Sequence, residues 1–530
     1  MLNTVIKKAQ KKKIPLTIAS VDLAKAYDRV NRPLLFAKLS ALGYTGKGLK
    51  ILQSLYFNDS VRVNVNRRLT RDLYLNLGVK QGCSLSPILF AIYINDLIEK
   101  LHNAKHGVKL ARSILSVLAF ADDVLCFSRT SKAGTEEQMR IIMNWCAKWK
   151  MEISQSKTYI ATMSRTITEW EVEGNSEQLS FDESRMFTYL GVDFRVKGRD
   201  FLGDHYEKML KKADKYVFAI LNTTRDLLDR SLVARSLWET CALPAIMYGT
   251  EACVLSKRCL KELEQKQKII ASFVTGLPRA GGNTALLLES GLIPIESRYH
   301  VRLHRFFNHL LESSSELVQE ALIEHKNSDW SSPYRELIIR VIRQYNVSGM
   351  TKEAAKSVIL ETTWNTLLKE VYELKSLKFL SIRNSMFELP GHVNDSEHST
   401  TLCQFRTGNT GIGNRIPLQG TTTQLKVCPF CYEEGSVSTS LNERHLLFSC
   451  SSLSDLQARY GFKQYAQTMG QGRKELLWEY LGGDKCSNSE LQTRGRRLLG
   501  FLNEYMTMVF QTDGVKNILR GKLRVLELCL

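Results

Sequence analysis

Two kinds of hydrophobic pattern divide the chain into a mixed first part and a helical second part. In the first part, short runs of strand-forming residues alternate with stretches of helical spacing; the clearest runs are Leu16–Val21, Val117–Phe120 and Val124–Phe127. From 203 to about 385, apolar positions recur every three or four residues beside a lysine-rich face, which predicts helices. Residues 390–425 lose this period and gather Gly, Asn, Ser and Thr, which indicates a linker.

The pattern also predicts elements between the first strand and the predicted hairpin at 117–127. Arg32–Phe57 has helical apolar spacing, and Val61–Asn66 alternates as a strand, so we expect both to belong to the scaffold of the first part. Ser86 and Pro87 are typical of a helix start, with Ser at the cap and Pro in the first turn. They predict an amphipathic helix over Ile88–Leu101.

Carboxylates interrupt two of the predicted strands. Asp122 and Asp123 lie in the expected turn between Phe120 and Val124, and Asp22 ends the first strand. Buried anions placed together repel one another and lose hydration, unless a cation neutralises them. An Asp pair alone is typical of a solvated turn, but the third carboxylate favours a divalent metal site.

The chemistry of such a site depends on its oxygen ligands. A few carboxylates that leave room for water and phosphate suit Mg²⁺. Two such ions, about 3.5–4 Å apart, activate an attacking hydroxyl and stabilise a departing pyrophosphate. The three aspartates therefore predict nucleotidyl transfer.

The amino-acid composition indicates that the protein binds a polyanionic partner. The 530 residues hold 73 Lys and Arg against 54 Asp and Glu, a net charge of +19, which favours nucleic acid over a neutral ligand. No apolar run reaches the roughly 18 residues of a membrane span, so we expect an intracellular protein without a membrane partner. The 12 cysteines are too sparse for a disulfide scaffold. We expect Cys126, Cys146 and Cys241 to be inert core thiols.

A second predicted metal site lies near the C-terminus. The spacing C-x2-C-x13-H-x4-C is formed by Cys428, Cys431, His445 and Cys450. Four such ligands predict a structural Zn²⁺ with no open position for catalysis. Buried thiols with a surface histidine remain the alternative.

The motifs, in their order and spacing, resemble the reverse transcriptase of non-LTR (LINE-type) retrotransposons. The matching segments are Val21–Val30 (motif A), Gly78–Pro87 (motif B), Phe120–Asp123 (motif C), Trp149–Thr158 (motif D) and Phe187–Val192 (motif E). Leu243–Gly249 and Glu289–Pro294 resemble LINE thumb segments, and LINE proteins carry a similar CCHC element after the thumb.

The resemblance implies roles for individual residues. Asp22, Asp122 and Asp123 would hold two Mg²⁺, with Asp22 and Asp122 as the bridging ligands, and Lys157 would protonate the leaving pyrophosphate. Tyr27 would close the sugar pocket, where LINE enzymes more often have Phe. The remaining implied contacts are Gln81 and Gly82 to the nucleotide, and Tyr189, Leu190 and Gly191 to the primer.

The resemblance also implies an α+β fold and an order of domains. We expect a palm with a ferredoxin-like antiparallel sheet and helices over 1–195, an all-α thumb over 203–385, the linker, a zinc element over 426–455, and a basic helical region over 456–530. In the family, a fingers region precedes motif A, and we expect most of it to be missing from this chain. We expect the endonuclease to lie on a missing part of the polyprotein.

The predicted function is RNA-directed DNA synthesis, with template RNA, a DNA primer or target DNA, and dNTPs as partners, and with a nuclear location. One alternative is a catalytically inactive, truncated remnant that only binds nucleic acid. A weaker alternative is another palm polymerase, such as a group II intron or telomerase enzyme.

Overall fold

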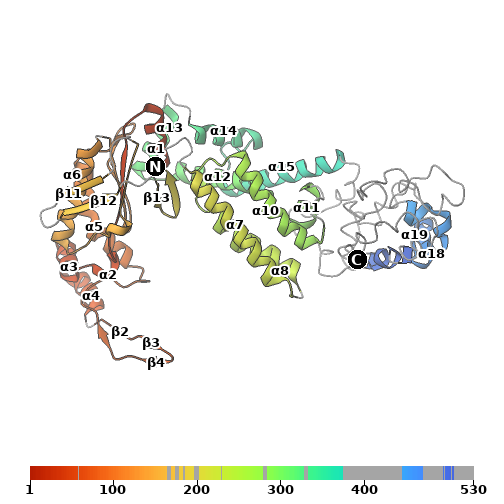
Figure 1. The fold of residues 1–530 in the computed structure, drawn as a ribbon, viewed down its shortest axis with the longest axis horizontal. Coiled ribbons are helices and arrows are strands. Elements are labelled where there is room, and N and C mark those ends of the chain that lie inside the picture. Colours follow the sequence, from red (N-terminus) through yellow and green to blue (C-terminus); the bar gives the residue numbers. More distant parts are fainter. Residues whose placement is uncertain are drawn as a thin grey trace. The chain divides into compact units, whose positions relative to one another are not determined.

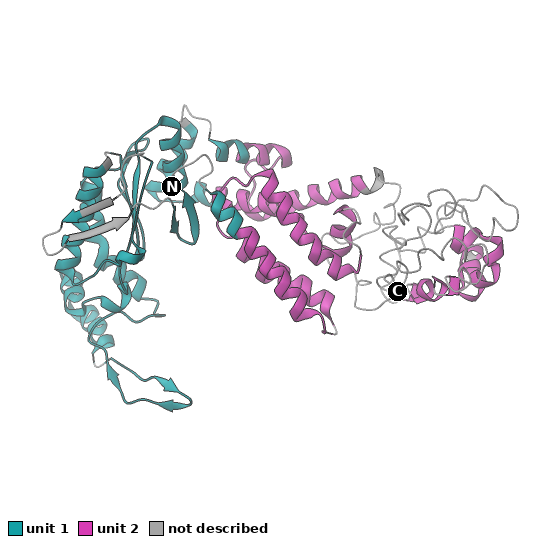
Figure 2. Ribbon diagram, in the orientation of Figure 1, with its two compact units in different colours: residues 1–208, 309–337 teal, residues 209–308, 338–530 magenta. Residues whose placement is uncertain are grey.

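The computed structural model describes residues 1–57, 59–129, 131–163, 169–173, 178–182, 186–195, 202–227, 229–277, 283–327, 332–373, 445–469, 493–494, 496–502 and 504–505. The chain forms two compact units, residues 1–208 with 309–337 and residues 209–308 with 338–530 (Figure 2). In the described ranges, no helix is both long and apolar enough to cross a membrane.

A four-stranded antiparallel sheet is the centre of the first unit (Figure 1). Its strands are β1 (Thr17–Asp22), β8 (Val117–Phe120), β9 (Asp123–Ser128) and β10 (Tyr159–Thr162), in the spatial order β10-β1-β9-β8. Because helix α5 (Ser86–Asn103) follows β1 and helix α6 (Ser131–Trp149) follows β9, the chain runs β-α-β-β-α-β. This is the ferredoxin-like arrangement that the sequence predicts for the palm.

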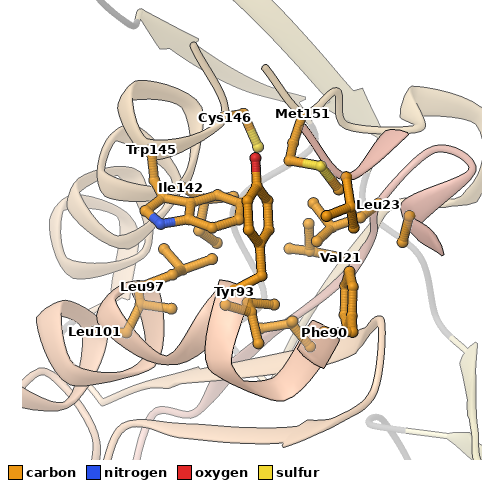
Figure 3. Close-up of a cluster of buried hydrophobic side chains, with 14 of the residues drawn as sticks. Val21, Leu23, Phe90, Tyr93, Leu97, Leu101, Ile142, Trp145, Cys146 and Met151 are labelled. Carbon is orange, nitrogen blue, oxygen red and sulfur yellow. The ribbon is translucent and has the colours of Figure 1, made fainter. Parts of the chain in front are cut away.

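Helices α5 and α6 pack on the sheet through one large apolar core (Figure 3). Val21 of β1 lies among Phe90 and Tyr93 of α5 and Trp145 of α6, and all four are nearly inaccessible to solvent. The rings of Tyr93 and Trp145 meet edge to face with centroids 6.1 Å apart, a favoured aromatic geometry. The indole nitrogen of Trp145 donates to Asp96 Oδ1 at 2.8 Å, so burial leaves no unpaired donor there.

The opposite face of the sheet is buried as well. Ile18 of β1 is paired in register with Phe127 of β9, and both are fully buried together with Leu125. Burial on both faces explains why β1 and β9 are almost continuously apolar rather than alternating.

The remaining elements of the first unit surround this sheet. They are α1 (Leu2–Lys12), α2 (Ala26–Arg29), α3 (Arg32–Ala41), α4 (Gly46–Tyr56), β2 (Ser60–Val61), β3 (Asn64–Val65), β4 (Arg68–Leu69), β5 (Leu73–Tyr74), β6 (Val108–Lys109), β7 (Ile114–Leu115), η1 (Gln155–Lys157), β11 (Glu169–Glu173), β12 (Gln178–Asp182), β13 (Met186–Tyr189), β14 (Val192–Arg195) and α13 (Glu316–Asn327). Helices α3 and α4 confirm the helical spacing of Arg32–Phe57.

Two expectations about this unit were wrong. Val61–Asn66 does form strands, but they belong to an exposed arm (β2 to β5) and not to the palm scaffold. Ser86 is inside α5 and does not cap it; its hydroxyl donates to the carbonyl of Lys80 at 2.6 Å. The serine therefore ties the preceding loop to the helix.

Residues 309–337 join the first unit through α13, which packs against α1. Lys8 Nζ lies 2.7 Å from Glu324 Oε1 in a nearly buried ion pair, and the Thr4 hydroxyl lies 2.9 Å from His325 Nε2. The sequence analysis did not anticipate this grouping, because no local pattern relates positions so far apart.

Arg32, the first residue of α3, connects several loops of the first unit. Its buried guanidinium donates to the carbonyls of Gly78, Tyr56 and Leu75 and to Asp59 Oδ2, at 2.5–3.2 Å. Arginine suits this position because its planar donors point in several fixed directions. The same guanidinium lies 4.9 Å from the Tyr56 ring centroid. Motif B is thereby fixed to the start of α3.

The second unit is built from helices in its described part. They are α7 (Gly203–Thr224), α8 (Arg230–Leu237), η2 (Trp238–Ala242), α9 (Leu243–Ile246), η3 (Thr250–Ala252), α10 (Lys257–Thr275), α11 (Asn283–Ser290), α12 (Ile295–Glu312), α14 (Pro333–Tyr345) and α15 (Lys352–Glu373). The start of α7, the end of α12 and the start of α14 belong to the first unit. They confirm the helical period predicted from residue 203 onward.

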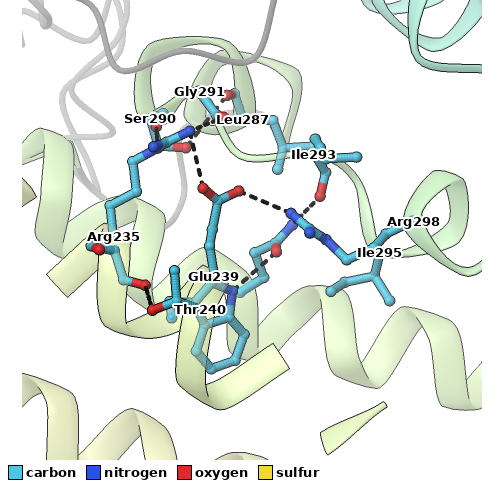
Figure 4. Close-up of polar contacts among 12 residues, drawn as sticks. Arg235, Glu239, Thr240, Leu287, Ser290, Gly291, Ile293, Ile295 and Arg298 are labelled. Carbon is cyan, nitrogen blue, oxygen red and sulfur yellow. Dashed lines mark hydrogen bonds and ion pairs between the residues drawn. The ribbon is translucent and has the colours of Figure 1, made fainter. Parts of the chain in front are cut away.

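A partly buried charge network joins α8, η2 and α12 (Figure 4). Glu239 Oε1 accepts from Arg298 of α12 at 2.9 Å, and its Oε2 lies 3.2 Å from Arg235 of α8. Arg235 also donates to the carbonyls of Ser290 and Gly291 at the end of α11. Burial lowers the pKa of Arg298. The LINE-like segment Glu289–Pro294 thus receives arginine donors at its carbonyls.

The cysteine expectation holds for two residues of three. Cys126 and Cys146 are buried, and burial raises the pKa of Cys126 to about 12, which makes it an inert thiol. Cys241 is exposed, so its assignment to the core was wrong. It lies in the π-helical turn η2, where the wider spacing of residues rotates it away from the buried Trp238 and Ala242.

The described C-terminal residues form short helices: η7 (His445–Ser449), η8 (Ser451–Leu453), α18 (Ser454–Arg459) and α19 (Phe462–Met469). Phe462 and Phe501 meet edge to face at 5.2 Å, so this region has a small aromatic core of its own. The predicted linker 390–425 lies outside the described residues.

Replacing Arg32 by Met tests its role. We expect a loss of about 3–5 kcal/mol in the free energy of unfolding, because Asp59 and three carbonyls lose a buried partner. Chemical denaturation followed by tryptophan fluorescence would measure this. The matched change Arg258→Met, in an exposed ion pair of α10, should leave stability nearly unchanged. Equal effects of the two substitutions would contradict the role assigned to Arg32.

Candidate active site

Two neighbouring strands bring three carboxylates to one end of the sheet. Asp22 is the last residue of β1, and the antiparallel register places it opposite Asp123, the first residue of β9. Asp122 is adjacent, in the turn between β8 and β9. The structure therefore gathers the three aspartates that the sequence singles out, although Asp22 is distant from the other two along the chain.

The turn that carries Asp122 is tighter than predicted. Phe120 pairs with Asp123, so only Ala121 and Asp122 form the turn, and Asp123 belongs to the strand. Ala121 has a φ of 53°, the positive value that two-residue hairpin turns require at their first central position. A side chain is unfavourable in that conformation, so the turn is locally strained.

Negative charge shapes the electrostatics of this end of the sheet. Although Asp123 is largely exposed, its pKa is raised by partial desolvation and by the charges of Asp122 and Asp22. Desolvation and the charge of Asp123 raise the pKa of Tyr189 to about 12, and desolvation and Asp122 raise the pKa of Tyr27. Both tyrosines thus stay neutral and lie within the field of the carboxylates.

The segment that resembles motif D runs along the end of β1. The amide of Ser154 donates to the carbonyl of Asp22 at 2.9 Å, and the amide of Asp22 donates to the Thr158 hydroxyl at 3.3 Å. Lys157 Nζ lies 3.8 Å from Asp22 Oδ2, while most of the lysine side chain is exposed. The structure therefore brings Lys157 to the carboxylates on an extended and accessible side chain.

The predicted nucleotide-binding residues lie on the neighbouring loops. Tyr27, in α2, stacks on Phe90 with ring centroids 4.9 Å apart, and its carbonyl accepts from the amide of Val79. Gln81 Nε2 donates to Asp28 Oδ1 at 3.0 Å, which orients the amide beside α2. Gly82 has a φ of 82° and open space where a Cβ would stand.

Gly78 explains the close contact between these loops. A Cβ built on Gly78 would lie 2.9 Å from the carbonyl oxygen of Asp28, and the residue has a φ of 84°. A larger residue would therefore push the motif B loop away from α2. This close approach fixes the positions of Tyr27 and Gln81 relative to each other.

The predicted primer-grip residues form a second hairpin turn. Tyr189 pairs with Val192 at the end of β13 and the start of β14, which leaves Leu190 and Gly191 as the turn. Their φ values of 48° and 75° match the mirror-image turn that suits twisted hairpins. Desolvation and the charge of Asp123 act on Tyr189, which precedes this turn, and raise its pKa.

Comparison with known proteins agrees with this geometry. Residues 2–194 match the family described as reverse transcriptase (RNA-dependent DNA polymerase), and this range contains all three aspartates. This part of the chain is a reverse transcriptase domain. The family match extends over β1, the two hairpins and the motif D segment.

Curated relatives are retrotransposon proteins. The chain is 32% identical over 126 residues to a Retrovirus-related Pol polyprotein from type-1 retrotransposable element R2 of Popillia japonica, covering 24% of this chain and 21% of the relative. It is 23% identical over 319 residues to a probable RNA-directed DNA polymerase from transposon BS of Drosophila melanogaster, covering 57% and 33%. The chain thus spans about one fifth to one third of these relatives.

A solved structure of apo telomerase from Candida tropicalis also matches. It is 13% identical, with a TM-score of 0.29, over 72% of this chain and 54% of that chain.

The donor set of the reverse transcriptase domain suits Mg²⁺, since it consists of carboxylate oxygens on adjacent strand ends. Nevertheless, among the described residues no group of three His, Cys, Asp or Glu side chains is arranged closely enough to hold an ion. Asp22 is turned toward Lys157, whose Nζ lies 3.8 Å from Asp22 Oδ2.

The predicted zinc ligands are only partly described. Cys428 and Cys431 lie outside the described residues. His445 and Cys450 are both buried, and the amide of Cys450 donates to the carbonyl of His445 at 2.8 Å. The helical turn η7 therefore keeps these two residues near each other, which the spacing H-x4-C requires.

Sequence reasoning missed three residues that position the site. Phe90 supports Tyr27, Asp28 orients Gln81, and Thr158 accepts from the amide of Asp22. Asp28 and Thr158 fall within the motif A and motif D segments, so the motifs gave a signal for them. Phe90 lies in an amphipathic helix, where nothing distinguishes it from other core residues.

Replacing Asp123 by Asn tests the repulsion between the carboxylates. In EDTA at pH 7 we expect a gain in stability of about 1 kcal/mol or less, the size of a contact between two unit charges in water. Added Mg²⁺ should stabilise the wild type more than the variant, because the variant has lost one ligand. Thermal unfolding with and without Mg²⁺ measures both effects, with Asp455→Asn on the exposed face of α18 as control. Identical Mg²⁺ responses of wild type and Asp123→Asn would contradict the assignment.

Proposed function

We propose that this chain is the RNA-directed DNA polymerase region of a non-LTR retrotransposon, which extends a DNA primer on an RNA template. The observation that carries the proposal is the register of β1 and β9, which sets Asp22 opposite Asp123 with Asp122 in the adjoining turn. The match of residues 2–194 to the reverse transcriptase family supports the same reaction.

The three aspartates would hold two Mg²⁺ ions, with Asp22 and Asp122 as the bridging ligands. When bound, such ions activate the primer hydroxyl and neutralise the departing pyrophosphate. The strand ends fix the backbone of Asp22 and Asp123, and the strained turn fixes Asp122. Because the backbones already lie close together, binding of the ions would require only rotations of the three side chains.

Other residues would bind and orient the substrates. Tyr27 would pack under the sugar of the incoming nucleotide, held by its stacking on Phe90. Gln81 and Gly82 would contact the nucleotide and the template from the motif B loop. The hairpin turn at Tyr189, Leu190 and Gly191 would position the primer end, since Tyr189 lies within the field of Asp123.

Lys157 would donate a proton to the leaving pyrophosphate. Its ammonium group already lies 3.8 Å from Asp22 Oδ2, and its exposed side chain can follow a substrate. A general acid must reach the atom that it protonates, so reach and mobility support this role.

The proposed partners are template RNA, a DNA primer or target DNA, and dNTPs. The net charge of +19 favours such partners, because phosphate contacts release bound counterions. Helical residues of the second unit would act as a thumb on the duplex. The endonuclease of the element would be encoded elsewhere in its polyprotein, and we propose a nuclear location from the family alone.

A catalytically inactive, nucleic-acid-binding remnant is the second candidate. It is favoured by the net charge of +19, which nucleic-acid binding alone would explain.

Asp122→Asn separates the two candidates. We expect it to abolish extension of oligo(dT) on poly(rA) with Mg²⁺ and dTTP, while binding of the template–primer remains nearly unchanged, because the substitution removes a ligand and little volume. Asp455→Asn, an exposed change of the same kind, should extend as the wild type does. Primer extension by the Asp122→Asn variant would contradict the assignment of polymerase activity to this site. Salt-sensitive binding of the template–primer by the wild type, without extension, would favour the inactive remnant.

We also propose a structural Zn²⁺ held by Cys428, Cys431, His445 and Cys450. The burial of His445 and Cys450 within one helical turn supports it. Elemental analysis of the purified chain should find about one zinc per molecule, and Cys428→Ser should lose it and destabilise the C-terminal helices. A zinc-free chain of unchanged thermal stability would refute this site.

A further inference from the structure

An exposed two-stranded arm extends from the first unit between α4 and the motif B loop (Figure 1). Its strands pair as β2 with β5 and β3 with β4. Two residues separate Val61 from Asn64 on the first strand, whereas three separate Leu69 from Leu73 on the second, so the second strand contains a bulge. All arm residues from Ser60 to Arg71 are exposed.

The base of the arm is fixed to the palm. Asp59 pairs with the buried Arg32 at 2.9 Å and with Lys80 of motif B at 3.1 Å. Further out, Arg62 and Asp72 form a bidentate ion pair across the two strands, at 2.7 and 3.1 Å. With about seven residues per strand at about 3.4 Å each, the arm reaches roughly 20 Å from this base.

The outer half of the arm carries unbalanced positive charge. Between residues 60 and 71 there is no acidic residue, and Asp72 is already engaged by Arg62. Arg67, Arg68 and Arg71 make no ion pair and no side-chain hydrogen bond with any described residue. Three guanidinium groups are thus presented to solvent at the tip.

The tip also keeps an arginine where the backbone favours glycine. Asn66 and Arg67 form the turn, with φ values of 50° and 65°. Asn-Gly is the pair that such a mirror-image turn prefers, because glycine has no Cβ to clash. A charged side chain held in this conformation points to a function of the guanidinium rather than to a need of the fold.

The composition of the arm identifies the form of nucleic acid. From Arg62 to Leu73 no residue is aromatic, so the outer part of the arm offers no surface on which the unstacked bases of a single strand would stack; the exposed Tyr74 of β5 lies at the base of the arm. It offers instead arginines for phosphates, and the apolar side chains of Val61, Val63 and Val65 on one face of the strand. A two-stranded ribbon is also narrow enough to follow a groove.

We propose that the arm is a phosphate clamp for double-stranded nucleic acid, with Arg67, Arg68 and Arg71 as its phosphate contacts. The proposal rests on the proposed function only in taking nucleic acid as the substrate of the chain. The clamp gives the duplex a contact at the end of an arm that reaches roughly 20 Å from its base, in the same compact unit as the aspartates.

Binding of the full chain to labelled 20-base-pair duplexes, without dNTPs, tests the clamp. Arg67→Gly suits the turn, so the triple variant Arg67→Gly, Arg68→Gln, Arg71→Gln should retain a folded arm. We expect its affinity for an RNA–DNA hybrid to fall about tenfold or more, and the slope of log affinity against log salt to fall by about 2–3, roughly one per lost phosphate contact. Affinity for single-stranded RNA and DNA should fall clearly less than affinity for the hybrid, because a duplex presents the higher density of phosphate charge.

Matched variants keep the result specific. Lys11→Gln, Lys12→Gln, Lys13→Gln removes the same charge from the exposed end of α1 and should leave hybrid binding within about threefold of the wild type. Lysine at all three arginine positions should restore most of the binding. RNA and DNA duplexes, compared with the hybrid, show which duplex the clamp prefers.

The proposal is overturned if the wild type binds no duplex or if the arm variant binds the hybrid as tightly as the wild type does. It is also overturned if the α1 control variant loses as much affinity for the hybrid as the arm variant, or if the arm variant loses as much affinity for single strands as for the hybrid. These outcomes are independent of extension. If the wild type binds duplex through the arm but extends no primer, the proposed polymerase activity is refuted and the proposed role of the arm stands.

Discussion

The pairing of β1 with β9 is the constraint on which the proposed site depends. In an antiparallel pair each residue has one opposite partner, so the register that joins Ile18 to Phe127 also joins Asp22 to Asp123. A slip of one residue would turn every side chain of the slipped strand to the other face of the sheet, disrupt the packing on both faces and separate Asp22 from Asp123. The carboxylates are therefore held together by the apolar residues of the strands and not by any attraction of their own.

What keeps that register is burial on both faces. On one side the strands meet the core around Tyr93 and Trp145, and on the other side Ile18, Leu125 and Phe127 are fully buried. Desolvation and the charges of Asp122 and Asp22 raise the pKa of Asp123, so partial burial and repulsion both oppose the assembly of the three carboxylates. The large core supplies the free energy that this repulsion costs, which is the usual relation between a strained site and its scaffold.

Much of this arrangement follows from local sequence, and the rest does not. The hairpin around Asp122, the strand that ends at Asp22 and the helices from residue 203 are visible as periodicity, because each depends on neighbours along the chain. The hydrogen bonds of Arg32 to several loops and the approach of Lys157 to Asp22 depend on tertiary contacts. The exposure of Cys241 depends on a π-helical turn. The alternation of Val61–Asn66 predicts a strand correctly, but alternation cannot tell a buried scaffold strand from an exposed arm.

Three turns with a proposed function in the first unit share a strained backbone conformation. Ala121 precedes Asp122, Leu190 belongs to the proposed primer grip, and Arg67 forms the tip of the arm; all three have positive φ although glycine would be easier. At each of these positions the backbone conformation is strained, and either the residue itself or its neighbour in the turn carries the side chain with the proposed function. A turn with two glycines would hold its neighbours more loosely, since glycine has more conformations to lose. The cost of a side chain at these positions therefore yields hairpin tips with fewer alternative conformations, which is what the placement of Asp122 beside Asp123 requires.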